Sequence, residues 1–180
     1  MPPDGWSPHM RVVSYRSLTG AISVGLTLAV FADGSHAACP QELAVYSEPE
    51  AQAGLEFTPA AHGAMPTHNF KVKFPENAVI LDGVVMTTEG VTRPHGTLMH
   101  KCPEGDVTGE ELAACTIWQG TIYAVDEKGN AGLLPEQGQP AAKQIILPDF
   151  AAFARESSIW GTTGISKLPG DIFSMSGCQE

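Results

Sequence analysis

Short runs of β-branched and aromatic residues, separated by glycine and proline, recur along most of the chain. This pattern is typical of β-strands joined by turns, because β-branched side chains fit a pleated sheet while Gly and Pro end strands. A hydrophobic content of 43% is enough for one folded core. We therefore expect a mainly β fold (or α+β with little helix), as a compact antiparallel sandwich or barrel-like domain. The predicted strands cover residues 43–47, 69–74, 78–88, 116–125, 132–134 and 143–147, with 159–160 and 172–173 as short closing strands.

One of these runs contains a turn signal. Asp82-Gly83 lies between two apolar triplets, and both positions accept the positive φ that a two-residue hairpin turn needs. The pattern favours a hairpin at Gly83. The alternative is a single strand that runs straight through it.

Helix signals are few and short. Thr108 is followed three residues later by Glu111, which is the spacing of a capping box at a helix start. Asp149 is expected to cap a second helix over residues 149–155. The apolar face of this second helix is predicted to consist of Phe150, Phe153 and Ala154.

The first 37 residues read as a secretory signal peptide. Arg11 and Arg16 precede an uncharged run over residues 18–32, and small residues lead to a cleavage site after Ala37. The run is shorter than the ~20 residues that a membrane-spanning helix needs. Cleavage, and no stable membrane insertion afterwards, is therefore the expectation, with Met10 as a possible true start.

The remainder, residues 38–180, is predicted to be a single β-rich domain that is periplasmic or secreted. It contains all four cysteines, and an even number of cysteines in an exported chain predicts two disulfides. Three pairings are open. We favour Cys102–Cys115, which brackets a short excursion, and Cys39–Cys178, which ties together the ends of the domain.

The net charge of the chain is −10. This deficit of Lys and Arg argues against nucleic acid as a partner, because binding to phosphates needs a cationic surface. The predicted signal peptide carries two basic and two acidic residues, so the whole charge belongs to the exported domain. A cationic envelope or secreted protein is the expected partner. The alternative is that the charge only maintains solubility.

A group of titratable residues near one predicted sheet edge is a candidate active site. Glu89, Arg93, His95 and His100 would supply a base, an anion clamp and a proton shuttle. They predict, as an alternative function, a small envelope hydrolase with a Glu/His site. The simpler interpretation is a surface turn with a salt bridge.

Histidine and methionine also cluster. Imidazole and thioether groups are suitable copper ligands, so a copper-binding protein is a second alternative function, and copper is the only cofactor suggested. The simpler interpretation is a solvated loop with a core methionine. The candidate ligands are His62, Met65, His68, His95, Met99 and His100.

The segment Leu98 to Gly120 (LMHKCPEGDVTGEELAACTIWQG) and the ending SGCQE resemble small exported bacterial proteins of an uncharacterised family. The resemblance implies export and the cysteine framework, and it implies no activity, cofactor or site residue. The function we expect from the sequence is thus a non-enzymatic periplasmic or secreted binding module.

Overall fold

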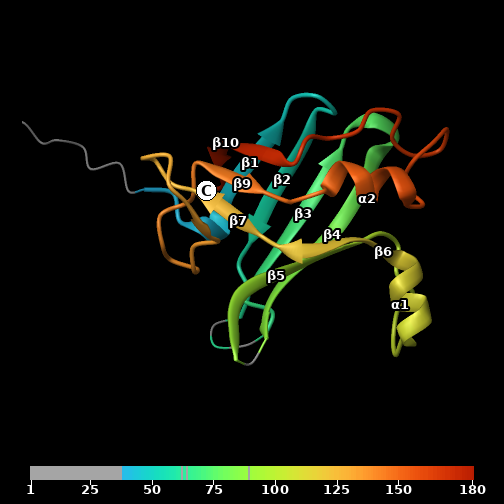
Figure 1. Cartoon of the computed structure of the whole chain (residues 1–180), viewed down its shortest axis with the longest axis horizontal. Helices are drawn as coiled ribbons and strands as arrows, with labels where there is room; N and C mark the ends of the chain where they lie inside the picture. The colour runs from blue at the N-terminus through green and yellow to red at the C-terminus, as the bar shows by residue number, and fades with distance from the viewer. Residues whose placement is uncertain (1–37, 62, 64, 89) are drawn as a thin grey trace, which may run out of the picture. The chain divides into compact units, whose positions relative to one another are not determined.

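The computed structural model describes residues 38–61, 63, 65–88 and 90–180. The predicted signal peptide, including Met10, lies outside the described residues. Within them the chain is mostly β, as the sequence predicts (Figure 1). The strands are β1 (Ala44–Glu48), β2 (Ala53–Thr58), β3 (His68–Phe74), β4 (Val79–Thr88), β5 (Val91–Met99), β6 (Thr116–Thr121), β7 (Tyr123–Val125), β8 (Ala131–Leu133), β9 (Gln144–Ile146) and β10 (Ile172–Cys178). The helices are α1 (Gly109–Cys115) and α2 (Phe150–Glu156), with 3-10 turns η1 (Gln41–Leu43) and η2 (Glu76–Ala78).

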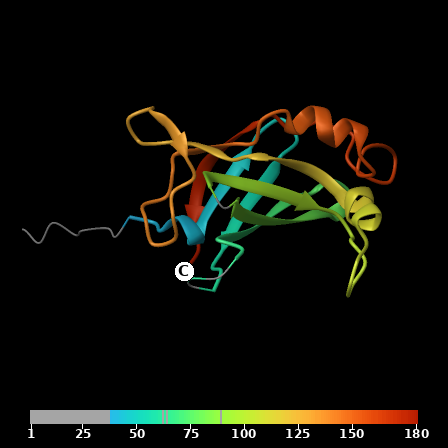
Figure 2. The same ribbon diagram turned by 60° about the horizontal axis from the view of Figure 1, so that its bottom comes forward.

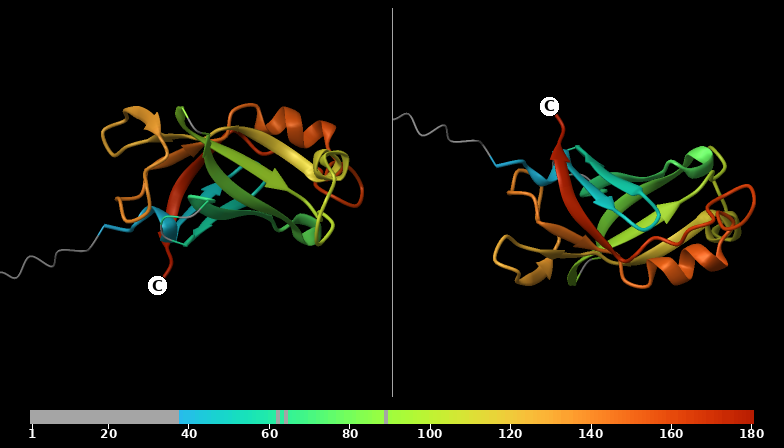
Figure 3. Two further views of the ribbon diagram at one scale, coloured as in Figure 1. Left: turned by 90° about the horizontal axis from the view of Figure 1, so that it is seen from below. Right: turned by 90° about the horizontal axis from the view of Figure 1, so that it is seen from above.

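These strands form one antiparallel sheet in the order β6-β5-β4-β3-β2-β1-β10-β9-β7-β8. The sheet curls into a half-barrel, because β6 and β7 belong to one continuous segment. β6 pairs with β5 at one edge, and after Ile122 the same segment pairs with β9 near the other edge. Figures 2 and 3 show this segment, in yellow, running back toward the orange and red strands. The Ile122 amide donates to the Pro94 carbonyl at 3.1 Å where the segment changes partners.

The core fills the inside of the curl. Alternate residues of β2 and β3 are buried, because successive side chains of a strand point to opposite faces. Aromatic rings pack in chains of tilted and edge-on contacts, and the charge distribution of the rings favours the edge-on ones. The fully buried aromatic side chains are Trp118, Tyr46, Phe57, Phe70, Phe150 and Phe173.

Both predicted helices are present. Thr108 and Glu111 form the expected capping box at the start of α1. Asp149 immediately precedes α2, as predicted, but it does not cap the helix. It has φ 60 and its side chain makes no capping hydrogen bond. The Asp171 carboxylate caps this helix instead, accepting from the amides of Asp149 at 2.9 Å and Ala151 at 3.4 Å.

Both favoured disulfides are confirmed. Cys39 and Cys178 are bonded with a Cα–Cα distance of 5.8 Å, and Cys102 and Cys115 with 5.2 Å. The first bond holds together the start of the described chain and the last strand, which pairs with β1. The second closes the loop that contains α1.

Three strand predictions were wrong. β4 runs straight through Gly83, so there is no hairpin at that residue. β2 and β5 were not among the predicted strands. Residues 159–160 form no strand, and Trp160 makes only an isolated bridge to Ile165.

Candidate functional site

The titratable candidates on β5 separate along the strand. Arg93 donates from Nη1 to the Tyr123 hydroxyl at 3.2 Å. His95 is exposed on the sheet face opposite the core, paired with exposed Met86. His100 follows the other end of β5, on the order of 17 Å from His95 at ~3.4 Å per residue. The structure therefore does not bring His100 together with His95, and Glu89 lies outside the described residues.

The copper candidates also divide into groups. Met65 and His68 line one hollow of about 860 Å³. Met99 and His100 lie at the far end of β5, and His62 lies outside the described residues. Among the described residues, no group of three or more His, Cys, Asp or Glu side chains is arranged to hold a metal ion. Copper binding stays a prediction.

His68 is a core residue and not an open ligand. It is 4% exposed, its Nδ1 is 3.2 Å from Thr67 Oγ1, and its ring contacts Phe57 edge-on. Its Nε2 is inaccessible and makes no hydrogen bond of ordinary length within the described chain, although the Pro135 carbonyl is near enough to raise the pKa. Burial is the larger effect and lowers the pKa of His68 below its usual value.

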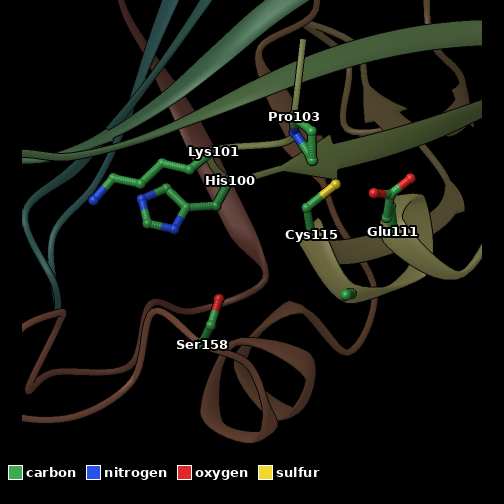
Figure 4. A pocket seen from close by; sticks show the side chains of 7 residues that line it. His100, Lys101, Pro103, Glu111, Cys115 and Ser158 are labelled. Carbon is green, nitrogen blue, oxygen red and sulfur yellow. The ribbon is translucent and has the colours of Figure 1, made fainter. Parts of the chain in front are cut away.

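A cleft lies beside His100, between β4, α1 and the segment after α2. It consists of two adjoining hollows of about 430 and 400 Å³ that share His100, Lys101 and Ser158. We call it the His100 cleft. Figure 4 shows the His100 ring and the Lys101 chain extending to one side, away from the Glu111 carboxylate, while the Ser158 hydroxyl points toward the space below the ring.

The carboxylates around the His100 cleft already have partners. Asp82 forms an ion pair with Lys71. Glu111 accepts from the Thr108 amide and hydroxyl, both at 2.9 Å, and these bonds lower the pKa of its carboxyl. Burial and the Lys101 charge lower the pKa of His100, with Asp82 acting in the opposite direction. At neutral pH the ring is therefore neutral and can donate one N–H.

The backbone around the cleft is held in uncommon conformations. Asn77, Ala78 and Lys101 have φ of 52, 49 and 51, and all three line the cleft. Left-handed geometry is costly for residues with a Cβ and persists only where the surroundings impose it. Here the side-chain amide of Asn77 donates to the Gly164 carbonyl. The backbone amide of His100 donates to the Cys115 carbonyl at 2.9 Å.

The second distinctive surface is the loop closed by Cys102–Cys115, which we call the acidic arm. It carries four exposed carboxylates and no basic residue. Since no cation neutralises them within the loop, they give the arm a charge of about −4 at neutral pH. The four residues are Glu104, Asp106, Glu110 and Glu111.

An apolar groove borders this arm. Leu112 of α1 and Phe153 of α2 are 41% and 44% exposed, and both line one hollow of about 410 Å³ with Ile117 and Trp118 at its floor. Figure 1 shows β6 running between the two helices. We call this hollow the α1–α2 groove. The expectation that Phe153 packs on the sheet with Phe150 was wrong, because only Phe150 and Ala154 of this short helix reach the core.

Sequence reasoning selected His100 and missed the rest of both surfaces. Lys101 and Ser158 come from segments far apart in the chain, as do Leu112 and Phe153. A local sequence pattern does not predict that such distant residues line the same hollow. The disulfide spacing was the one usable signal, because it indicated a separate short loop.

Comparison of the chain with family models, with curated proteins and with solved structures finds no match. Fold and surface define the described chain as a disulfide-linked, antiparallel β domain with an acidic arm. None of its described helices is long and apolar enough to cross a membrane.

Proposed function

We propose that this chain is a non-enzymatic binding module, periplasmic or secreted, that binds a cationic protein at the acidic arm and the α1–α2 groove. The observation that carries the proposal is the adjacency of two exposed apolar side chains, Leu112 and Phe153, to a loop with four carboxylates and no basic residue.

Charge and apolar surface have separate roles in this proposal. The carboxylates attract a cationic partner over a distance of about one Debye length. This attraction raises the association rate and favours partners of positive charge over negative ones. The groove supplies the short-range burial that holds the partner, since the exposed parts of Leu112 and Phe153 lose water on contact. The matching surface is a segment whose Lys or Arg residues flank large apolar side chains.

The proposed compartment is supported by the disulfides. Two bonds use all four cysteines of the sequence, and no described cysteine is free. Such bonds persist in oxidising compartments and are rare in the cytosol. The signal-peptide pattern of residues 1–37 is the sequence support for export.

Two synthetic peptides of equal length and charge test the proposal. One places Leu at spacings of three and four residues and Lys at the other positions, which makes an amphipathic helix, and the other replaces each Leu with Ser. We expect the protein to bind the Lys/Leu peptide about tenfold more tightly by calorimetry. Its affinity should fall when NaCl is raised from about 50 to about 300 mM, since salt screens the attraction.

Matched variants locate the binding site. In the arm variant, Glu104→Gln, Asp106→Asn and Glu110→Gln remove three charges, and Glu111 is kept because it caps α1. The control variant, Glu50→Gln, Glu127→Gln and Glu180→Gln, removes three exposed charges elsewhere. The arm variant should lose about tenfold in affinity and the control about twofold. Equal losses, or no binding of either peptide, would contradict the proposal.

A further inference from the structure

The His100 cleft is distinct from the α1–α2 groove, although residues of the acidic arm line both hollows. α1 lies between the two, with Leu112 and Ala113 lining the groove and Glu111, Ala114 and Cys115 lining the cleft. Their lining differs: the groove presents exposed apolar side chains, whereas the cleft presents hydrogen-bond donors beside the carboxylates of Asp82 and Glu111.

Four side chains that donate hydrogen bonds line the two hollows of the cleft: Lys101, His100, Ser158 and Thr163. Within the part of the chain that the structure describes, none of these side chains has a hydrogen-bond or ion-pair partner. Lys101 contributes a positive charge, and neutral His100 contributes one N–H. This set provides one cation and three neutral donors.

The negative groups near these donors are occupied. The Asp82 carboxylate pairs with Lys71, and the Glu111 carboxylate bonds to Thr108 and points away from the His100 ring (Figure 4). Lys101 therefore faces the cleft without an acidic partner from β4 or α1. Lys101 is the cationic side chain among the described residues that line the two hollows, and the two carboxylates beside it keep their charges while bonded to other groups.

We infer that the His100 cleft binds a small anion through one phosphate or carboxylate group, held by Lys101, His100 and Ser158. Hollows of about 430 and 400 Å³ are in the size range of small-molecule sites. Pro103 and Ala114 form an apolar wall on one side, so an anion with a small carbon body fits better than a bare ion. An acidic polypeptide is less suited, because the neighbouring acidic arm repels it.

The walls are rigid enough to hold this geometry without a ligand. Lys101 precedes Cys102, which is bonded to Cys115, and the left-handed backbone at Asn77 is held by the hydrogen bond from its side-chain amide to the Gly164 carbonyl. Preorganised donors lose little freedom on binding. The overall negative charge opposes anion binding, so we expect a dissociation constant on the order of 1 mM.

The histidine resonances of the protein report on the site directly. We would titrate the side-chain NMR signals between about pH 5 and 8 in NaCl, and in inorganic phosphate or acetate at equal ionic strength. The His100 signal is assigned by its loss in His100→Gln. An anion beside the ring favours the protonated form, so the pKa of His100 should rise by about half a unit, with the signal of exposed His95 as the internal reference.

Two charge-matched variants complete the test. Lys101→Gln should abolish the response of His100 to both anions, whereas Lys128→Gln, in the turn before β8, should leave it intact. A response to phosphate alone assigns a phosphate ligand, and a response to both assigns a site that also takes carboxylates. Equal shifts of His100 and His95, no shift of either, or a full response in Lys101→Gln would overturn the inference.

Discussion

The ring of Phe70 lies directly over Gly83, its antiparallel partner on the next strand. A Cβ added at Gly83 would come 2.6 Å from two ring atoms of Phe70 and 2.7 Å from a third, closer than carbon atoms can approach. The glycine therefore makes room for a fully buried aromatic ring of the core. Aromatic residues often cover glycine in sheets in this manner.

Gly83→Ala should destabilise the protein by about 1–3 kcal/mol, because the ring must leave its rotamer or the strands must separate. Gly54→Ala is the matched control on another inner strand, where an added Cβ would be 3.9 Å from the nearest atom. It should change the stability by less than about 0.5 kcal/mol. Urea unfolding of both variants makes the comparison, and equal effects would show that the Phe70 contact does not matter.

This glycine also explains why the sequence misled. Asp82-Gly83 between apolar triplets has the composition of a hairpin turn, and only the ring packed over it reveals its other role. The strands with clear alternation or β-branched runs, such as 69–74 and 116–125, could be predicted locally. β2 and β5 could not, because both contain residues that usually mark loops, including Gly54, Pro94 and Gly96. Pairing on both sides makes them strands.

The candidate surfaces were predictable only in part, for the same reason. The sequence indicated an acidic chain, a short disulfide loop and the residue His100. It did not indicate that Phe153 would remain exposed. Spacing on a helix shows which residues share a face, but not how much of that face the sheet covers. The curl of the sheet determines how much of α2 is covered.

Phe150 and Phe153 provide a test within a single helix. Phe150 is fully buried and contacts Phe74, Trp118 and Phe173, so Phe150→Ala should cost about 3–5 kcal/mol of stability. Phe153→Ala should cost less than about 1 kcal/mol, while weakening the binding of the Lys/Leu peptide. Chemical unfolding and calorimetry measure the two effects. A large loss of stability in Phe153→Ala would contradict the assignment of this side chain to the groove.

The two disulfides should differ in their contributions to stability. Their sequence separations are 139 and 13 residues, and a longer closed loop restricts the unfolded chain more. Replacing Cys39 and Cys178 by Ala should cost about 5 kcal/mol, and replacing Cys102 and Cys115 about 3 kcal/mol. Guanidinium unfolding of the two double variants ranks them, and the reverse order would show that native contacts outweigh loop entropy.

Tyr46 should make the protein sensitive to alkali. Its single hydroxyl hydrogen is shared between two acceptors, the Ala142 carbonyl at 3.0 Å and Gln41 Oε1 at 3.2 Å, and burial raises its pKa to about 12. The unfolded chain releases this proton near pH 10, so the stability contribution is complete below about pH 10 and is lost as the pH rises toward 12. A pKa shift of this size corresponds to a loss of about 2–3 kcal/mol of folding stability when the pH passes from below 10 to above 12.

Tyr46→Phe isolates this effect. The variant should lose about 1–2 kcal/mol at neutral pH with its hydrogen bonds, and its stability should fall less between about pH 10 and 12. Urea unfolding at several alkaline pH values provides the data. If the free energy of unfolding fell equally with pH in both proteins, Tyr46 would not be the cause of the alkaline loss of stability.

His68 should make the protein sensitive to mild acid. Burial lowers its pKa in the folded state, so the unfolded chain binds a proton more readily than the folded one. The contribution of His68 to stability is complete above the unfolded pKa of about 6.5 and is lost as the pH falls through the lower folded value.

His68→Gln, which keeps a polar neutral side chain at this position, should lose less stability than the parent between about pH 7 and 5. His95→Gln is the control because His95 is exposed on the other face of the sheet. An unchanged acid profile in His68→Gln would mean that other groups, His100 among them, account for the acid sensitivity.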